Sequence, residues 1–185
     1  MQQSKRYRYI DDYKVVPYVG AGGKSKQRLE YIGKYVNITD DAAETMRLLR
    51  RVQVGVVLIL LLLGTCLVLE HSASRTMYVA VPSILNVFPL AYMCIGVFMF
   101  PKRIEPMRRD AFAHSISRVQ HSAIGIVAFC ALTLIGTVIY WIFAGDYFLI
   151  IDAIFIAVTI SEAALSYTIY RRLKGIKTEL LPNKA

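Results

Sequence analysis

Residues 52–69 read VQVGVVLILLLLGTCLVL, 18 positions without a charged side chain. The hydrocarbon core of a bilayer is about 30 Å thick, and a helix rises about 1.5 Å per residue, so about 20 apolar residues cross it. In lipid every backbone N–H and C=O group needs a partner within the protein, and a helix supplies these partners by itself. The stretch is therefore predicted to be a transmembrane helix.

Three further blocks of the same kind follow, at 77–100, 123–143 and 147–170, and only the last contains charged residues. The whole chain is 56% hydrophobic and 19% charged, against about 45–50% and about 25% in soluble domains. We therefore expect an all-α membrane protein, a bundle of four transmembrane helices at about 52–69, 77–100, 123–143 and 147–170. These helices and their connections would form one domain, 41–185, after a separate segment at 1–40.

Lysine and arginine are distributed unevenly around the four blocks. Of the 22 basic residues, 21 lie before the first block, between the second and third, or after the fourth, and only Arg75 lies in the other connections. Because positively charged loops stay in the cytoplasm, we expect a multi-pass protein of the cell membrane with both termini cytoplasmic.

The net charge of +9 is explained by this topology and by contact with anionic lipid. Nucleic acid is not an expected partner. The basic residues that flank the blocks are predicted to contact lipid headgroups, and they are Arg50, Arg51, Lys102, Arg103, Arg171 and Arg172.

The segment 1–40 is predicted to hold a β-hairpin in the cytoplasm. Residues 13–19 and 27–36 are rich in β-branched and aromatic side chains, and the glycine-rich stretch 20–23 between them is typical of a turn. An isolated hairpin is marginally stable in water. We expect it to pack on a partner protein or on the protein's own loops rather than on lipid.

Two sites mark the expected beginnings of helices on the cytoplasmic side. Asp41, with Glu44 three positions later, has the spacing of a capping box, so a helix is predicted over 42–69. Pro106 suits the first turn of another helix. The apolar stripe that follows predicts either an interfacial helix or a long start to the third transmembrane helix.

Polar residues within the fourth block are the main candidates for a functional site. At about 100° per residue, Asp152, Thr159, Glu162 and Ser166 fall within about 80° of one another. Glu162 lies deep in the block, where an unpaired carboxylate is costly, whereas Asp152 lies close enough to the outer boundary to reach water. We expect this stripe to face other helices or a wet cavity.

The second block contains Pro82, Asn86 and Pro89. Each proline removes one helical hydrogen bond, so a kink is predicted there. Asn86 could hydrogen-bond to a neighbouring helix, a contact typically worth about 0.6–2 kcal/mol. It is therefore counted with the stripe of the fourth block as a possible intramembrane site.

The sequence contains no HExxH or GxSxG motif, and its three cysteines form no CxxC pair. We therefore expect no enzymatic activity, cofactor or metal. The favoured interpretation is an accessory or assembly subunit of a larger membrane complex, docking through the intramembrane polar residues and the hairpin onto a partner protein or another copy. The alternative is a small proton-coupled transporter or channel, acting as a homo-oligomer with Glu162 as the proton carrier.

Overall fold

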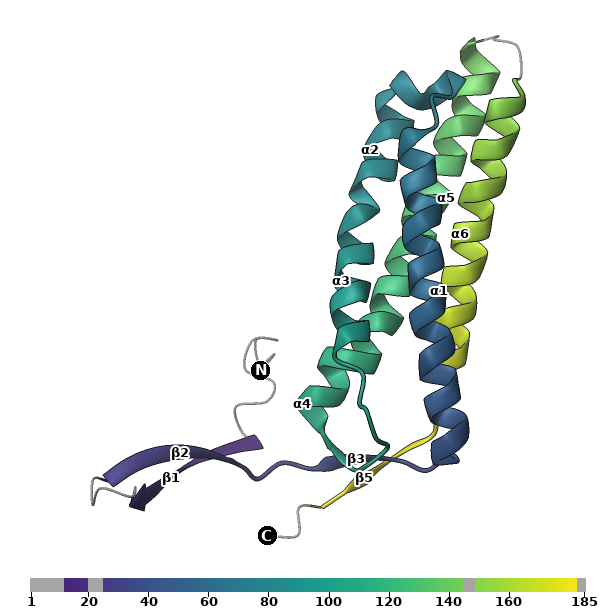
Figure 1. Cartoon of the computed structure of the whole chain (residues 1–185). Coiled ribbons are helices and arrows are strands. Elements are labelled where there is room, and N and C mark those ends of the chain that lie inside the picture. Colours follow the sequence, from purple (N-terminus) through teal and green to yellow (C-terminus); the bar gives the residue numbers. More distant parts are fainter. Residues whose placement is uncertain (1–11, 20–24, 145–148, 183–185) are drawn as a thin grey trace.

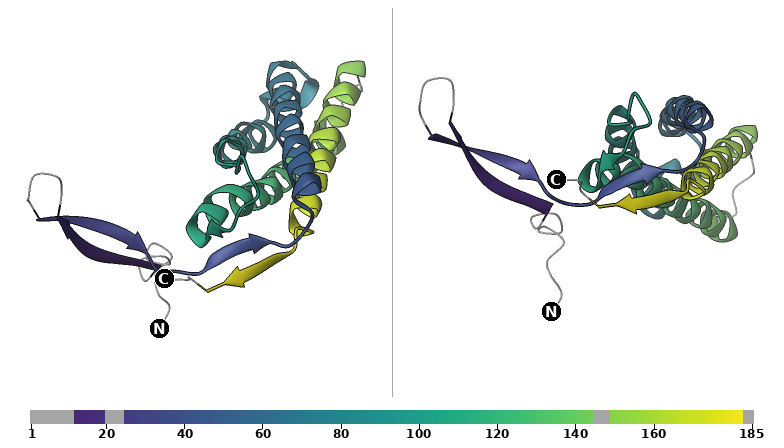
Figure 2. Two further views of the ribbon diagram at one scale, coloured as in Figure 1. Left: turned by 60° about the horizontal axis from the view of Figure 1, so that its bottom comes forward. Right: turned by 90° about the horizontal axis from the view of Figure 1, so that it is seen from below.

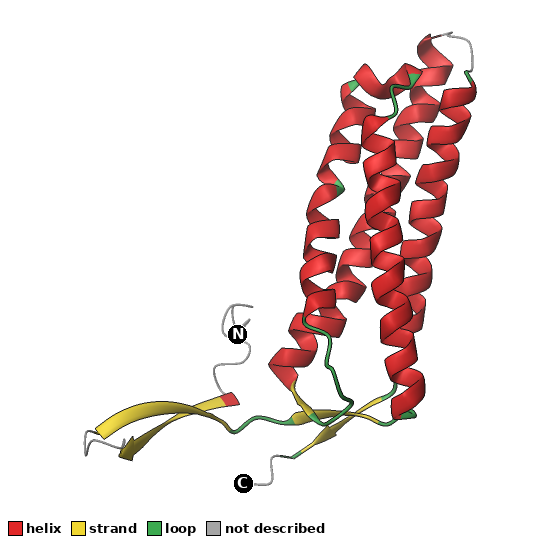
Figure 3. Ribbon diagram, viewed as in Figure 1, coloured by secondary structure: helices red, strands yellow, loops and turns green. Residues whose placement is uncertain are grey.

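The computed structural model describes residues 12–19, 25–144 and 149–182. It contains four helical spans that are long and apolar enough to cross a membrane, standing side by side in one bundle (Figure 1). The expected mostly helical fold with four such spans and a small N-terminal hairpin is confirmed. All the strands gather at one end of the bundle, called here the strand end, and the opposite end is called the far end (Figure 3).

The first span is α1 (Ala42–Val68). Its N-cap is Asp41, whose Oδ1 accepts a hydrogen bond from the Ala43 N–H at 3.2 Å, so the predicted helix start is confirmed. Apolar side chains three or four residues apart are buried: Leu49, Val52, Val56, Ile59 and Leu63. Large apolar side chains on its other sides are exposed: Val54, Val57, Leu58, Leu60, Leu61, Leu67 and Val68. So large an exposed apolar surface is rare on soluble monomers and suits a hydrocarbon environment.

The second span consists of two helices, α2 (Met77–Leu85) and α3 (Val87–Phe98), which meet at Asn86. Pro82 lies inside α2 and Pro89 lies in the first turn of α3. Asn86 is hydrogen-bonded to both helices: its N–H donates to the Pro82 carbonyl at 3.1 Å, and its carbonyl accepts from the Leu90 N–H at 3.3 Å. The prolines thus interrupt the span at one residue without separating its halves.

The third span joins α4 (Arg109–Phe112), a π-helical turn η4 (Ala113–Ser117) and α5 (Arg118–Ala144). This is the long helical start that was one of the two alternatives. The prediction that Pro106 lies in the first turn of this helix is wrong. Pro106 instead precedes a short strand, β4 (Met107–Arg108), because Met107 pairs with Val36 in a small sheet.

The fourth span, α6 (Ile150–Lys174), packs against both α5 and α1. Helix α5 also packs against α2 and α3, which makes it the central helix of the bundle. Glycines allow this close packing: a Cβ on Gly136 would lie 2.6 Å from the Tyr78 backbone oxygen, and one on Gly96 would lie 2.7 Å from Val119 Cγ2. Helices α1 and α3 contact each other less extensively.

The N-terminal hairpin consists of β1 (Tyr13–Val19) and β2 (Ser25–Tyr31), paired antiparallel with Tyr13 opposite Tyr31. The expected turn at 20–23 lies outside the described residues. The prediction of one continuous strand over 27–36 is wrong, because β2 ends at Tyr31 and the chain bends before the next strand. At this bend the Asp12 side chain closely approaches Gly33, where a Cβ would lie 2.5 Å from Asp12 Cγ.

That next strand, β3 (Tyr35–Ile38), is the middle strand of a second sheet. It pairs antiparallel with β4 on one side and with β5 (Thr178–Leu181) on the other. The sheet therefore joins the N-terminal segment, the connection between the second and third spans, and the C-terminal tail. The sheet lies across the strand end of the bundle (Figure 2). Its Val36 and Ile38 side chains are buried.

Candidate functional site

The polar stripe of α6 faces the inside of the bundle. Asp152, Thr159, Glu162 and Ser166 are all buried, with exposed fractions of 0%, 3%, 1% and 0%. Asn86 of the second span is buried as well, at 3%. None of these five side chains therefore lies on the bundle surface, where a partner could dock.

Glu162 and Asn86 meet in the interior. Asn86 Nδ2 donates a hydrogen bond to Glu162 Oε1 at 2.8 Å, and the same nitrogen lies 3.6 Å from the sulfur of Cys130. Because Asn86 occupies the junction of α2 and α3, the interruption of the second span lies at the level of the buried acid. Burying a carboxyl group without a hydrogen-bond partner would cost about several kcal/mol of folding free energy. Asn86 supplies one such partner for Glu162.

The other helices contribute polar side chains near this pair. Cys66 of α1 lies 3.6 Å from Thr159 Oγ1, and Thr159 is one helical turn before Glu162. We call Cys66, Asn86, Cys130, Thr159 and Glu162 the polar cluster. Each of the four spans provides at least one of its members. Sequence reasoning missed the two thiols, because a cysteine within an apolar block is usually a packing residue.

Ser166 does not join the polar cluster. Its hydroxyl is buried and has no hydrogen-bond partner among the described residues. It lies one turn beyond Glu162 toward the strand end, so it belongs to the same helix face but makes none of the same contacts. The shared face predicted from the sequence is observed, but it is not one continuous site.

Asp152 serves a different purpose at the far end. Its Oδ1 accepts from the Ser72 N–H at 2.9 Å, and its Oδ2 accepts from the Ser72 hydroxyl and the Leu149 N–H, both at 3.0 Å. These bonds cap the start of α6 and attach it to the turn η3 (Ser72–Arg75). The expectation that Asp152 reaches water is wrong, because its side chain is fully buried under that turn.

His71 covers this capped helix end. Its ring stacks on Phe155 at a centroid distance of 3.7 Å, and its Nδ1 lies 3.3 Å from the Leu69 carbonyl oxygen. Burial lowers the pKa of His71 from its ordinary value, because it disfavours the charged ring. The ring therefore acts as a neutral packing group in the connection between the first two spans.

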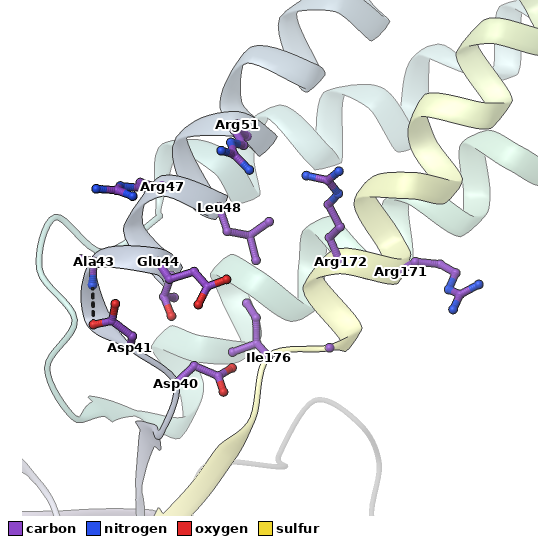
Figure 4. A pocket seen from close by; sticks show the side chains of 12 residues that line it. Asp40, Asp41, Ala43, Glu44, Arg47, Leu48, Arg51, Arg171, Arg172 and Ile176 are labelled. Carbon is purple, nitrogen blue, oxygen red and sulfur yellow. Dashed lines mark hydrogen bonds between the residues drawn. The ribbon is translucent and has the colours of Figure 1, made fainter.

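The basic residues predicted to contact headgroups are all exposed at the strand end: Arg50, Arg51, Lys102, Arg103, Arg171 and Arg172. Two of them, Arg51 and Arg172, point into a groove of about 680 Å³ between α1 and α6 (Figure 4). The same groove is lined by Asp40, Asp41 and Glu44. Its charge is therefore mixed rather than strongly positive.

The chemistry available to the polar cluster is limited. Among the described residues, no group of three or more His, Cys, Asp or Glu side chains could hold a metal ion. The cluster offers a carboxyl group, an amide, a hydroxyl and two free thiols, Cys66 and Cys130. A carboxyl group paired with an amide can hold a proton or accept a hydrogen bond. The arrangement directly supports these two roles.

No family model, no curated protein and no solved structure matches the chain.

Proposed function

We propose that this protein is a multi-pass membrane protein, not an enzyme, that serves as an accessory or assembly subunit of a larger membrane complex. In this proposal the strand end faces the cytoplasm, both termini are cytoplasmic by the distribution of lysine and arginine, and the docking element is the β1–β2 hairpin. The exposed apolar surface of the helices and the one-sided distribution of lysine and arginine support the membrane setting.

The observation that carries the proposal is the position of the hairpin. It extends sideways from the bundle rather than folding back onto it, as Figures 1 and 2 show from three directions. Val15 and Leu29 lie directly opposite each other in the hairpin and are 52% and 66% exposed. Directly opposed residues point to the same face of a two-stranded sheet. This pair is therefore an apolar contact point displaced from the membrane domain.

The base of the hairpin is held firmly. The Tyr13 hydroxyl donates to Asp110 Oδ2 at 2.6 Å, and this bond raises the pKa of Tyr13 above its ordinary value. The Tyr31 hydroxyl accepts from the Arg109 N–H at 3.1 Å and donates to the Lys34 carbonyl at 2.7 Å. A rigid base presents the exposed pair in a defined direction, which lowers the entropic cost of docking.

Docking through the intramembrane stripe receives no support from the geometry, because those side chains are buried within the protein's own bundle. The polar cluster instead links the four spans to one another. The proposed partner, a different protein or a second copy, therefore meets the hairpin.

The test is purification in a mild detergent from the native membrane, followed by measurement of mass and stoichiometry. We expect a defined complex that is lost in the Val15→Ser/Leu29→Ser double variant. The matched control is Lys14→Ser/Glu30→Ser, a directly opposed pair on the other hairpin face, which should leave the complex intact. A wild-type protein that runs as a monomer with nothing bound, or a complex indifferent to Val15 and Leu29, would refute the proposal.

A second candidate function is a proton-coupled transporter or channel that works as a homo-oligomer. One observation favours it: the buried acid Glu162 is bonded to Asn86 at the interruption of a membrane span, and interrupted helices beside ionisable residues occur in transport sites. An amide can donate to the ionised acid or accept from the protonated one, so the pair suits a proton carrier. In liposomes, Glu162→Gln should abolish proton flux and Thr159→Val should not. Absence of flux in the wild type, or flux unchanged in Glu162→Gln, eliminates this candidate.

A further inference from the structure

A second groove runs between α1 and α3 near the strand end. These two helices contact each other less extensively than α1 contacts α6 or α3 contacts α5. The volume of the groove is about 650 Å³. Its lining is mainly apolar and includes Val57, Leu60 and Val97 together with the basic residues Arg50 and Lys102. We call it the α1–α3 groove.

The α1–α3 groove differs from the groove between α1 and α6 in the charged residues that line it. Arg50 and Lys102 are the charged residues of the α1–α3 groove, and no carboxylate lines it. The α1–α6 groove has four arginines but also three acids. Arg50 and Arg51 are neighbours in sequence, yet they belong to different grooves because successive residues of a helix point about 100° apart.

The groove has its basic residues at one end and its apolar wall beyond them, which matches the headgroup and acyl chains of a phospholipid. Arg50 and Lys102 come from the last residues before the first apolar block and the first residues after the second, which is where headgroups are expected. The apolar wall extends along α1 from Arg50 to Leu60. Ten residues of helix rise about 15 Å, and this is about half the thickness of the hydrocarbon core, or one leaflet.

We propose that the α1–α3 groove binds one anionic phospholipid of the strand-end leaflet. The phosphate lies between Arg50 and Lys102, and an acyl chain follows the groove past Val57, Leu60 and Val97. The excess of positive charge at the mouth selects a headgroup of net negative charge over a zwitterionic one. A helix of another protein would bury the two cations against apolar surface, so lipid fits the lining better.

The inference relies on the membrane setting of the proposed function but not on docking by the hairpin. The experiment uses the full chain in nanodiscs of equal parts phosphatidylglycerol and phosphatidylcholine, released into the gas phase for native mass spectrometry. We expect one phosphatidylglycerol to be retained per chain, in preference to phosphatidylcholine. A basic residue near the membrane surface contributes about fivefold to binding of anionic lipid, so Arg50→Gln/Lys102→Gln should reduce retention by at least about tenfold.

The matched control is Arg51→Gln/Arg172→Gln, which removes the same charge from the α1–α6 groove and should leave retention unchanged. A second variant, Val97→Phe, fills the α1–α3 groove without altering its charge and should also displace the lipid. The inference is overturned by equal retention of the two lipids, by equal losses in the two double variants, or by full retention in Val97→Phe. None of these outcomes depends on whether a protein partner binds the hairpin, so failure of one proposal is distinguishable from failure of the other.

Discussion

Asn86 and Glu162 lie 76 positions apart in the sequence, on the second and fourth spans, and are joined by a 2.8 Å hydrogen bond from Nδ2 to Oε1. Both side chains are almost completely buried. The bond matters for stability because either group alone would be a buried polar side chain with a partner missing. It also gives a physical reason for an asparagine at the interruption of an otherwise apolar span.

Replacing Asn86 by leucine should destabilise the protein by about 1–3 kcal/mol, the cost of leaving a buried polar group without its hydrogen bond. Thermal unfolding in detergent, followed by circular dichroism, measures the effect. The Asn86→Leu/Glu162→Leu double variant should recover part of the loss, because both polar groups are then removed. If the losses of stability in the two single variants, Asn86→Leu and Glu162→Leu, simply add in the double variant, the bond contributes nothing.

Asp152→Ala should lower stability by about 1.5–3 kcal/mol, the usual range for hydrogen bonds that involve a charged group. The reason is that three donors lose their acceptor at the start of α6. Ser72→Ala removes only the hydroxyl donor and should cost less. In a double-mutant cycle the two changes should be less than additive, whereas strict additivity would mean that the two side chains do not interact.

Glycine-to-alanine substitutions in two helices should have opposite effects. In α5, a Cβ on Gly136 would lie 2.6 Å from the Tyr78 backbone oxygen, so Gly136→Ala should separate α2 from α5 and destabilise the protein by about 1–3 kcal/mol. Gly64 of α1 has no atom within 4 Å of its Cβ position. Gly64→Ala should therefore be neutral or stabilise by up to about 1 kcal/mol, the difference in helix propensity. Equal effects at the two positions would contradict the observed packing.

Stability should fall in mildly acidic solution because of His71. Burial lowers the pKa of this ring in the folded protein, so the unfolded chain binds the proton more tightly. The ring's contribution is therefore complete above its unfolded pKa of about 6.5 and is lost as the pH falls below that value. Unfolding temperatures measured from pH 8 to pH 5 should decrease less in His71→Phe than in the wild type. Identical pH profiles of the two proteins would show that protonation of the His71 ring is not linked to unfolding.

The helical architecture could be predicted because its causes are local. Block 52–69 needs only its length and lack of charge to be recognised as a span, and Asp41 needs only the N–H groups that follow it to cap a helix. The two short strands β4 and β5 could not be predicted in this way. Each exists because it pairs with β3, and the pairing residues Met107 and Leu180 are far from Val36 in the sequence.

The candidate site shows the same division. Helical periodicity placed Asp152, Thr159, Glu162 and Ser166 on one face of α6, because that depends only on the 3.6-residue repeat. Periodicity says nothing about what stands opposite each residue. Only the packed bundle brings Asn86 to Glu162, the thiol of Cys130 to Asn86, and Ser72 to Asp152. The sequence by itself determined which polar side chains share the inward face of the fourth helix. Tertiary packing decided which of them share a hydrogen bond, because a bond forms only where a residue of a neighbouring helix lies at the same level along the bundle axis.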